Sequence, residues 1–141
     1  MTEEILPKNV QVVDLPQYID QRGALSVVND FGVLPFKPKR LFWITDVPAG
    51  AERGGHAHWT CHEVLFVLSG CLEITIDDGV MSHTFVMNAP YKGVVIPAGA
   101  WCELRRFDTG TVCMVLASEA YDPTGYVHDK VEWRRQLNGC K

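Results

Sequence analysis

The sequence predicts an all-β fold, a barrel or sandwich, with one short helix near its C-terminal end. Short apolar runs recur about every ten residues, and Gly, Pro, Asn and Asp separate them, which is the spacing of such folds. After Pro123-Thr124-Gly125, the tail VHDKVEWRRQL is suited to a helix. The 141 residues match the length of one domain, so we expect a single domain over residues 1–141.

The expected elements follow from these runs in order. Residues 23–29 (GALSVVN) are predicted as the first strand, and residues 31–38 as irregular because two prolines interrupt any ladder there. Asp77-Asp78-Gly79 predicts a tight hairpin turn. The remaining predicted strands cover residues 40–45, 55–59, 63–68, 71–76, 82–87, 93–96, 101–107 and 111–118.

Composition excludes several classes of function. The net charge is -4 and the chain has no block of Lys or Arg, which argues against a nucleic-acid partner. No run approaches the roughly 20 apolar residues of a membrane helix, and the acidic start MTEEILPKNV has no signal-peptide core. The five cysteines include no CxxC pair and read as reduced thiols. We therefore expect a cytoplasmic protein with no membrane or nucleic-acid partner.

The most informative segment runs from Gly50 to Gly70. It contains His56-x-His58, Glu63 and a glycine at each end, with the spacing G-x5-H-x-H-x4-E-x6-G. This spacing is similar to the first signature of the cupin barrels. Side chains two apart in a strand share a face, so both imidazoles should point into the barrel. The predicted fold is thus a cupin barrel, also called a jelly roll.

Two chemistries remain open for this segment. The second cupin signature is incomplete, because Cys102 stands where its histidine belongs. His56, His58, Glu63 and Cys102 could still form a tetrahedral set for Zn²⁺. Alternatively, the two histidines transfer protons without a metal, and Arg53 holds an anionic substrate group at the barrel mouth. Our preferred interpretation is the second, with no metal and no cofactor.

Several further segments are informative together, namely Asp20-x-Arg22-Gly23-x-Leu25, Leu34-Pro35-Phe36, Lys39-Arg40-Leu41-Phe42, Arg53-Gly54-x-His56-Ala57-His58, Leu72 to Gly79, Val115-Leu116-Ala117-Ser118 and Tyr121-Asp122. Through these segments the sequence resembles, over nearly its whole length, the sugar 3,4-ketoisomerases, the WxcM-like cupins that act on dTDP-4-keto-6-deoxy-D-glucose.

The resemblance implies an isomerase of deoxysugar biosynthesis that works without a metal, as a homodimer with exchanged N-terminal strands. It implies that His56 and His58 remove the C3 proton of a dTDP-linked 4-keto sugar and return a proton at C4, through an enediol. Arg53 and Arg22 match family arginines and are expected to contact the substrate. Tyr121, with Tyr126, is expected to cap the nucleotide.

Three positions depart from the family pattern. Trp43 replaces a tyrosine of the family's active site, Glu63 stands where glutamine is common, and Cys102 stands where histidine is common. We retain all three as expected substrate-binding residues. The departures keep two rivals open, a metal-dependent cupin enzyme and a non-catalytic sugar-nucleotide-binding cupin. The sequence leaves the C4 configuration of the product, the nucleotide base and the downstream sugar undetermined.

Overall fold

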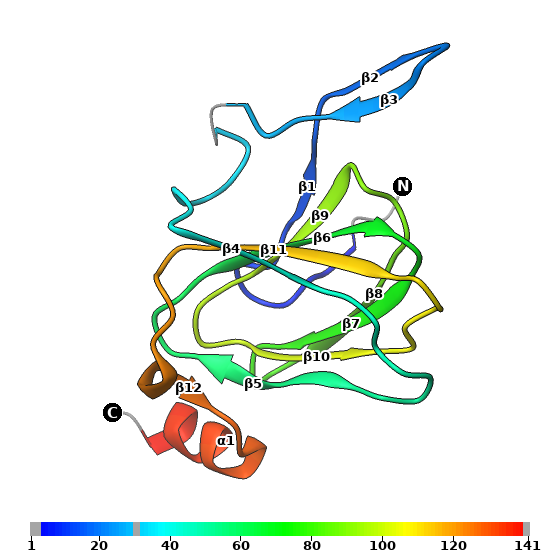
Figure 1. Cartoon of the computed structure of the whole chain (residues 1–141). Helices are drawn as coiled ribbons and strands as arrows, with labels where there is room; N and C mark the ends of the chain where they lie inside the picture. Colours follow the sequence, from blue (N-terminus) through cyan, green and yellow to red (C-terminus); the bar gives the residue numbers. More distant parts are fainter. Residues whose placement is uncertain (1–3, 30–31, 140–141) are drawn as a thin grey trace.

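A computed structural model of the chain describes residues 4–29 and 32–139. They form twelve strands, one short 3-10 helix and one α-helix (Figure 1). The helices are η1 (Pro123–Gly125) and α1 (Lys130–Gly139). The strands are β1 (Val12–Asp14), β2 (Gln17–Asp20), β3 (Gly23–Ser26), β4 (Arg40–Ile44), β5 (Arg53–His58), β6 (Glu63–Ser69), β7 (Leu72–Asp77), β8 (Ser82–Met87), β9 (Lys92–Ile96), β10 (Trp101–Arg105), β11 (Val112–Ala117) and β12 (Tyr126–Val127).

Two five-stranded antiparallel sheets enclose the core. One has the order β1-β9-β6-β11-β4 and the other β12-β5-β10-β7-β8. Inward-facing side chains of both sheets meet in one apolar cluster, with Leu65 and Val67 from the first sheet and Ile74, Ile76 and Leu104 from the second. The predicted all-β fold with a C-terminal helix is confirmed.

The central strands follow the predicted patterns. β7 alternates buried and partly exposed residues, as expected for a strand with one face on the core. The predicted turn between β7 and β8 is present, with Gly79 at a φ of 98°. The Asp78 carboxylate accepts hydrogen bonds from the backbone N–H groups of Val80 and Met81, at 2.7 and 2.8 Å. This turn chemistry fixes the hairpin register.

The N-terminal prediction is partly wrong. Two strands, β1 and β2, precede the predicted first strand, and β3 ends at Ser26 rather than at residue 29. β2 and β3 form a separate two-stranded sheet that projects from the barrel (Figure 1). Tyr18 and Ile19 are 64% and 72% exposed, so this hairpin has no buried face in one chain. A strand without a buried face lacks the alternation that sequence reading detects.

The predicted helix begins three residues later than expected. Val127 belongs to β12 and pairs with Ala57 of β5, so the helix cannot include it. The Asp129 carboxylate then accepts hydrogen bonds from the backbone N–H groups of Val131 and Glu132, which is an N-cap. Trp133 of α1 is fully buried. The helix therefore packs against β12 and β5 and stabilises their pairing. Neither described helix has the length and apolar character needed to cross a membrane.

Candidate active site

The histidine pair lies on β5, and local glycines shape the strand there. Gly54 and Gly55 have φ values of 80° and 68°, a region that suits glycine. A Cβ on Gly54 would lie 2.9 Å from the backbone oxygen of Cys102 on β10, where the register shifts. His56 and His58 share the inner face of β5, with ring centroids 4.9 Å apart and edge to face. The predicted convergence of the two imidazoles is confirmed.

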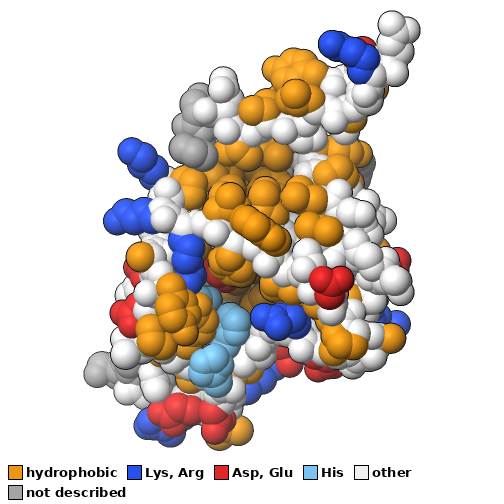
Figure 2. Space-filling model, in the orientation of Figure 1, with side chains coloured by type: hydrophobic (Ala, Val, Ile, Leu, Met, Phe, Trp, Pro, Cys, Tyr) orange, Lys and Arg blue, Asp and Glu red, His pale blue; other side chains and the backbone are white. Residues whose placement is uncertain are grey.

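A cavity of about 270 Å³ opens between the two sheets beside this pair. Figure 2 shows histidine side chains next to a hollow, with basic side chains on both sides of it. Six residues predicted from the sequence line the cavity together, namely Arg53, His56, Glu63, Cys102, Tyr121 and Tyr126. The other lining residues are Phe42, Ile44, Gly54, Leu65, Ile96, Leu104, Val115, Pro123 and His128. A cavity of this volume has room for a small molecule.

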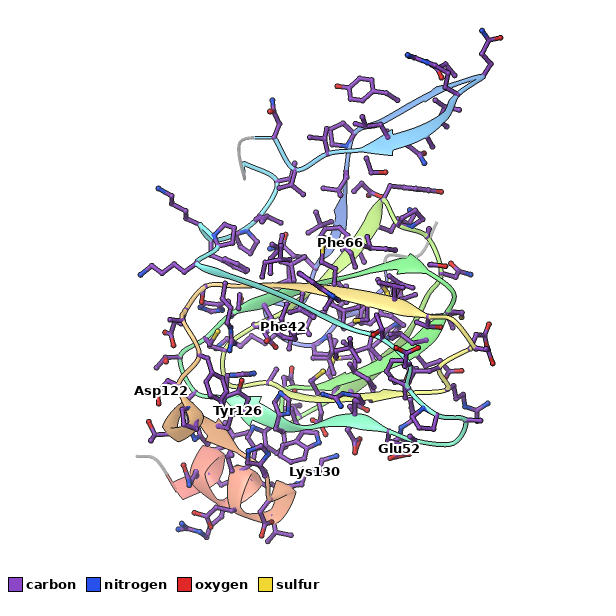
Figure 3. All side chains as sticks on the ribbon, viewed as in Figure 1. Phe42, Glu52, Phe66, Asp122, Tyr126 and Lys130 are labelled. Atoms are coloured by element: carbon purple, nitrogen blue, oxygen red, sulfur yellow. The ribbon has the colours of Figure 1, made fainter. Side chains whose placement is uncertain are left out.

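His58 lies deeper than His56. It is 6% exposed and is not among the residues that line the cavity. The Tyr126 ring, which points from β12 toward the barrel (Figure 3), lies 4.2 Å from the His58 ring between centroids. His58 Nε2 has no hydrogen-bond partner among the described residues but lies 3.4 Å from Glu63 Oε1. This carboxylate is thus the charged neighbour that can hold the His58 ring and pair with its imidazolium.

His56 has different surroundings. It is half-buried, and its ring contacts His58, Tyr126 and His128 at centroid distances of 4.9, 5.2 and 5.8 Å. Burial and then the neighbouring charge of His58 lower its pKa below the ordinary value. This lowering favours the neutral imidazole of His56 near neutral pH. A neutral imidazole on a cavity wall is suited to accept a proton from a bound molecule.

The structure gathers three candidate metal ligands, one fewer than the four that the sequence offered. His56, His58 and Glu63 each offer a ligand atom, and these atoms lie within 4.8 Å of one another. Cys102 does not belong to this group, and burial raises the pKa of its thiol well above the usual range. Cys102 Sγ therefore lies outside the group of ligand atoms that the structure gathers. Two imidazoles and a carboxylate fit a divalent cation, whereas the expected four-ligand set is not assembled among the described residues.

Two expected substrate residues lie away from the cavity of their own chain. Arg22 is at the tip of the β2–β3 hairpin and pairs with Asp20. Trp43 is 65% exposed, because β4 turns Phe42 and Ile44 inward and leaves alternate side chains on the outer face. The structure thus does not bring Arg22 or Trp43 together with the histidine pair within one chain.

Two residues near the pair were missed by the sequence analysis, His128 and Arg40. Tyr126 pairs with His58 across the β12–β5 ladder, so continuing this register places His128 opposite His56. The His128 ring stacks on Tyr126 at 5.5 Å and 4°. Arg40 lies near Glu63, with Nη2 4.0 Å from Oε2. Strand register brings both residues to the pair, and one sequence does not provide that register, although Arg40 lies in a segment that matches the family.

Comparison with known proteins identifies the family. The family described as FdtA, WxcM-like, C-terminal matches residues 8–138. The chain belongs to this family. It is 31% identical over 127 residues to the TDP-4-oxo-6-deoxy-alpha-D-glucose-3,4-oxoisomerase of Aneurinibacillus thermoaerophilus, and the match covers 90% of this chain and 91% of that protein. The resemblance seen in the sequence is therefore confirmed.

Solved structures of the same family share its fold. A mutant of the 3,4-ketoisomerase QdtA from Thermoanaerobacterium thermosaccharolyticum, in complex with TDP-4-keto-6-deoxyglucose, superposes with a TM-score of 0.90 at 29% identity. The match covers 95% of this chain and 97% of that one. A 3,4-ketoisomerase from Helicobacter canadensis superposes with a TM-score of 0.88 at 32% identity, over 92% of this chain and 98% of that one. The cupin barrel predicted from Gly50 to Gly70 is thus confirmed.

Proposed function

We propose that the protein is a dTDP-4-keto-6-deoxy-D-glucose 3,4-ketoisomerase of deoxysugar biosynthesis. The observation that carries this proposal is the His56–His58 pair on one inner face of β5, at 4.9 Å, beside the cavity. The named activities of the family members described above support the substrate class. The nucleotide would extend from the cavity mouth, where Arg53 and Tyr121 lie.

The reaction requires two proton transfers on carbon and two on oxygen. One base takes the proton from C3, the C3–C4 double bond forms, and O4 gains a proton to give an enediol. The enediol then loses the O3 proton, C3 becomes the ketone, and C4 gains a proton. Imidazole exchanges protons near neutral pH, so His56 and His58 are the groups suited to the transfers on carbon. Substrate and product are isomers, so the reaction needs no external oxidant or reductant.

Product analysis tests this proposal. The purified protein is incubated with TDP-4-keto-6-deoxyglucose, and the sugar is followed by proton NMR. We expect the proton signals of the 4-keto sugar to decrease and those of its 3-keto isomer to grow. Binding of the nucleotide sugar without conversion would instead indicate the non-catalytic rival.

A metal-assisted enzyme is the second candidate, because His56, His58 and Glu63 gather three ligand atoms within 4.8 Å. Such an ion would polarise a carbonyl oxygen of the sugar. Activity measured with and without a strong chelator separates the candidates. The proton-transfer proposal expects equal activity in both samples, and the metal candidate expects loss on chelation and recovery on adding a divalent cation.

We infer further that residues 1–141 form one cytoplasmic domain that works as a homodimer with exchanged N-terminal strands. The shared apolar cluster of both sheets supports one domain. Leu41 and Trp43 expose apolar side chains on the outer face of β4, and Figure 2 shows an apolar area below the projecting hairpin. A two-stranded sheet is barely stable alone, so β2–β3 needs a second surface. A second copy would cover it and is the route by which Arg22 could reach a substrate.

Light scattering after gel filtration tests the dimer. We expect a mass of two chains for the native protein and of one chain for Trp43→Glu, because a buried unpaired carboxylate opposes association. A native protein of one-chain mass at assay concentration would contradict the dimer.

A further inference from the structure

Arg40 is a largely buried charge that the proposed reaction does not use. It begins β4, and its side chain is 17% exposed. Its guanidinium lies over the rings of Phe42 and Tyr121, 5.2 and 5.7 Å from their centroids. Arg40 Nε is buried and has no hydrogen-bond partner among the described residues. A guanidinium in such surroundings needs an anion nearby, because desolvation of a charge is costly.

That anion is Glu63, two strands away. Its side chain is 7% exposed, and its Oε2 lies 4.0 Å from Arg40 Nη2. The strand between them is β11, where Ala117 pairs with Arg40 on one side and with Glu63 on the other. Residues opposite each other in a sheet point to the same face. The small methyl group of Ala117 therefore leaves room for the arginine to extend across β11.

The other carboxylate oxygen of Glu63 faces the histidine pair, with Oε1 3.4 Å from His58 Nε2. A continuous series of contacts thus runs from the cavity rim to the deeper histidine. It passes from Tyr121 to Arg40, then to Glu63 and finally to His58. Arg40 itself is not among the residues that line the cavity.

We propose that Arg40 is a positioning residue for the isomerase: by holding one oxygen of Glu63, it keeps the other oxygen on His58 and fixes that ring for proton transfer. This inference rests on the proposed function. Without Arg40, the buried carboxylate loses its guanidinium neighbour and can rotate away from His58. Partners behind the first layer of an active site orient it in this way.

A double-mutant cycle tests the proposal. Arg40→Met is made in the native protein and in Glu63→Gln, and kcat and KM are measured for TDP-4-keto-6-deoxyglucose. In the native background we expect kcat to fall about 10- to 100-fold while KM changes less than about twofold, the size of effect seen for orienting partners. In the Glu63→Gln background we expect a further loss of less than about threefold, because a neutral amide needs no counter-ion and the pair is coupled.

Equal losses of kcat in both backgrounds would overturn the proposal, because the effect would then be general packing. A rise in KM at unchanged kcat would also overturn it, since Arg40 would then contact the substrate. The matched control is Arg135→Met, which removes a guanidinium–carboxylate pair with Glu132 on α1 and should leave kcat unchanged. A native protein without isomerase activity would refute the proposed function instead.

Ala117→Val is the second variant, used if Arg40→Met does not fold. It fills the gap between Arg40 and Glu63 and removes neither charge. We expect kcat to fall with little change in KM in the native background, and to change little in Glu63→Gln. An unchanged kcat in the native background would overturn the positioning role of Arg40.

Discussion

One side of the cavity differs from the other in the kind of polar group it carries. β5 and β12 bring together rings that exchange protons or stack, with centroid distances of 4.2 to 5.8 Å. On the opposite side, β4 and β6 hold one guanidinium and one carboxylate, Arg40 and Glu63, with Nη2 and Oε2 4.0 Å apart. We propose from this difference a division of labour, in which one side reacts with the sugar and the other holds the reacting side in place.

The largest effect is expected on the reacting side, which is formed by β5 and β12. His56→Asn removes the base and keeps a polar side chain, so we expect kcat to fall by roughly 10²- to 10⁴-fold, the usual contribution of a general base. Steady-state kinetics and circular dichroism check this together. His83→Asn on β8, whose native side chain pairs with Glu4, is the matched control and should keep full activity. If His56→Asn kept an activity close to the native value, the reacting role proposed for this side would be wrong.

A smaller effect is expected on the other side, formed by β4 and β6, which orients His58. Glu63→Gln keeps the shape of the side chain but loses its charge, so it holds His58 and Arg40 less firmly. We expect kcat to fall about tenfold, at the lower end of losses for orienting partners. If kinetics instead show a loss as large as that of His56→Asn, Glu63 reacts directly and the two sides are not distinct.

The pH dependence separates the two sides in another way. Burial first, and the charge of His58 second, lower the pKa of His56 from 6.5, whereas the charge of Glu63 raises it. A base with a lowered pKa stays unprotonated as the pH falls through 6.5, so the acid limb of kcat/KM should lie below pH 6.5. Glu63→Gln should move this limb to still lower pH. A limb at or above pH 6.5 in the native protein would contradict this account of His56.

The smallest effect is expected at Cys102, which lies on the cavity wall beside His56 in the β10–β5 register. Because burial raises the pKa of its thiol well above the usual range, it does not exchange protons near neutral pH. Cys102→Ala should therefore leave kcat nearly unchanged. A large loss of kcat with normal thermal stability would show that the thiol contributes to the chemistry.

Sequence reasoning predicted the parts of the fold that bury at least one face. The β6 run and the alternation of β7 are patterns that burial imposes on a strand. β12 has two residues, too few for any pattern, and β2 has no buried face within one chain. The missed strands are thus too short or too exposed to show a pattern, since β1 has three residues, β12 has two and β2 is exposed.

The same distinction holds for the candidate site. His56, His58 and Glu63 lie within eight positions of one another, so spacing alone placed them together. Arg40 joins them only because Ala117 lies between two strands in register, and His128 only because β12 continues along β5. Trp43 is the opposite case. Its neighbours Phe42 and Ile44 line the cavity, whereas its own side chain is exposed on the outer face.

Proton transfer in D₂O tests the central claim most directly. The chelator-treated native protein, His56→Asn and His58→Asn are each incubated with TDP-4-keto-6-deoxyglucose, and the sugar is followed by NMR. Proton transfer through exchangeable imidazoles predicts a 3-keto product that carries deuterium at C4, formed by the native protein and by neither variant. A native protein that gives no 3-keto product and leaves the C3 hydrogen unexchanged would contradict the account.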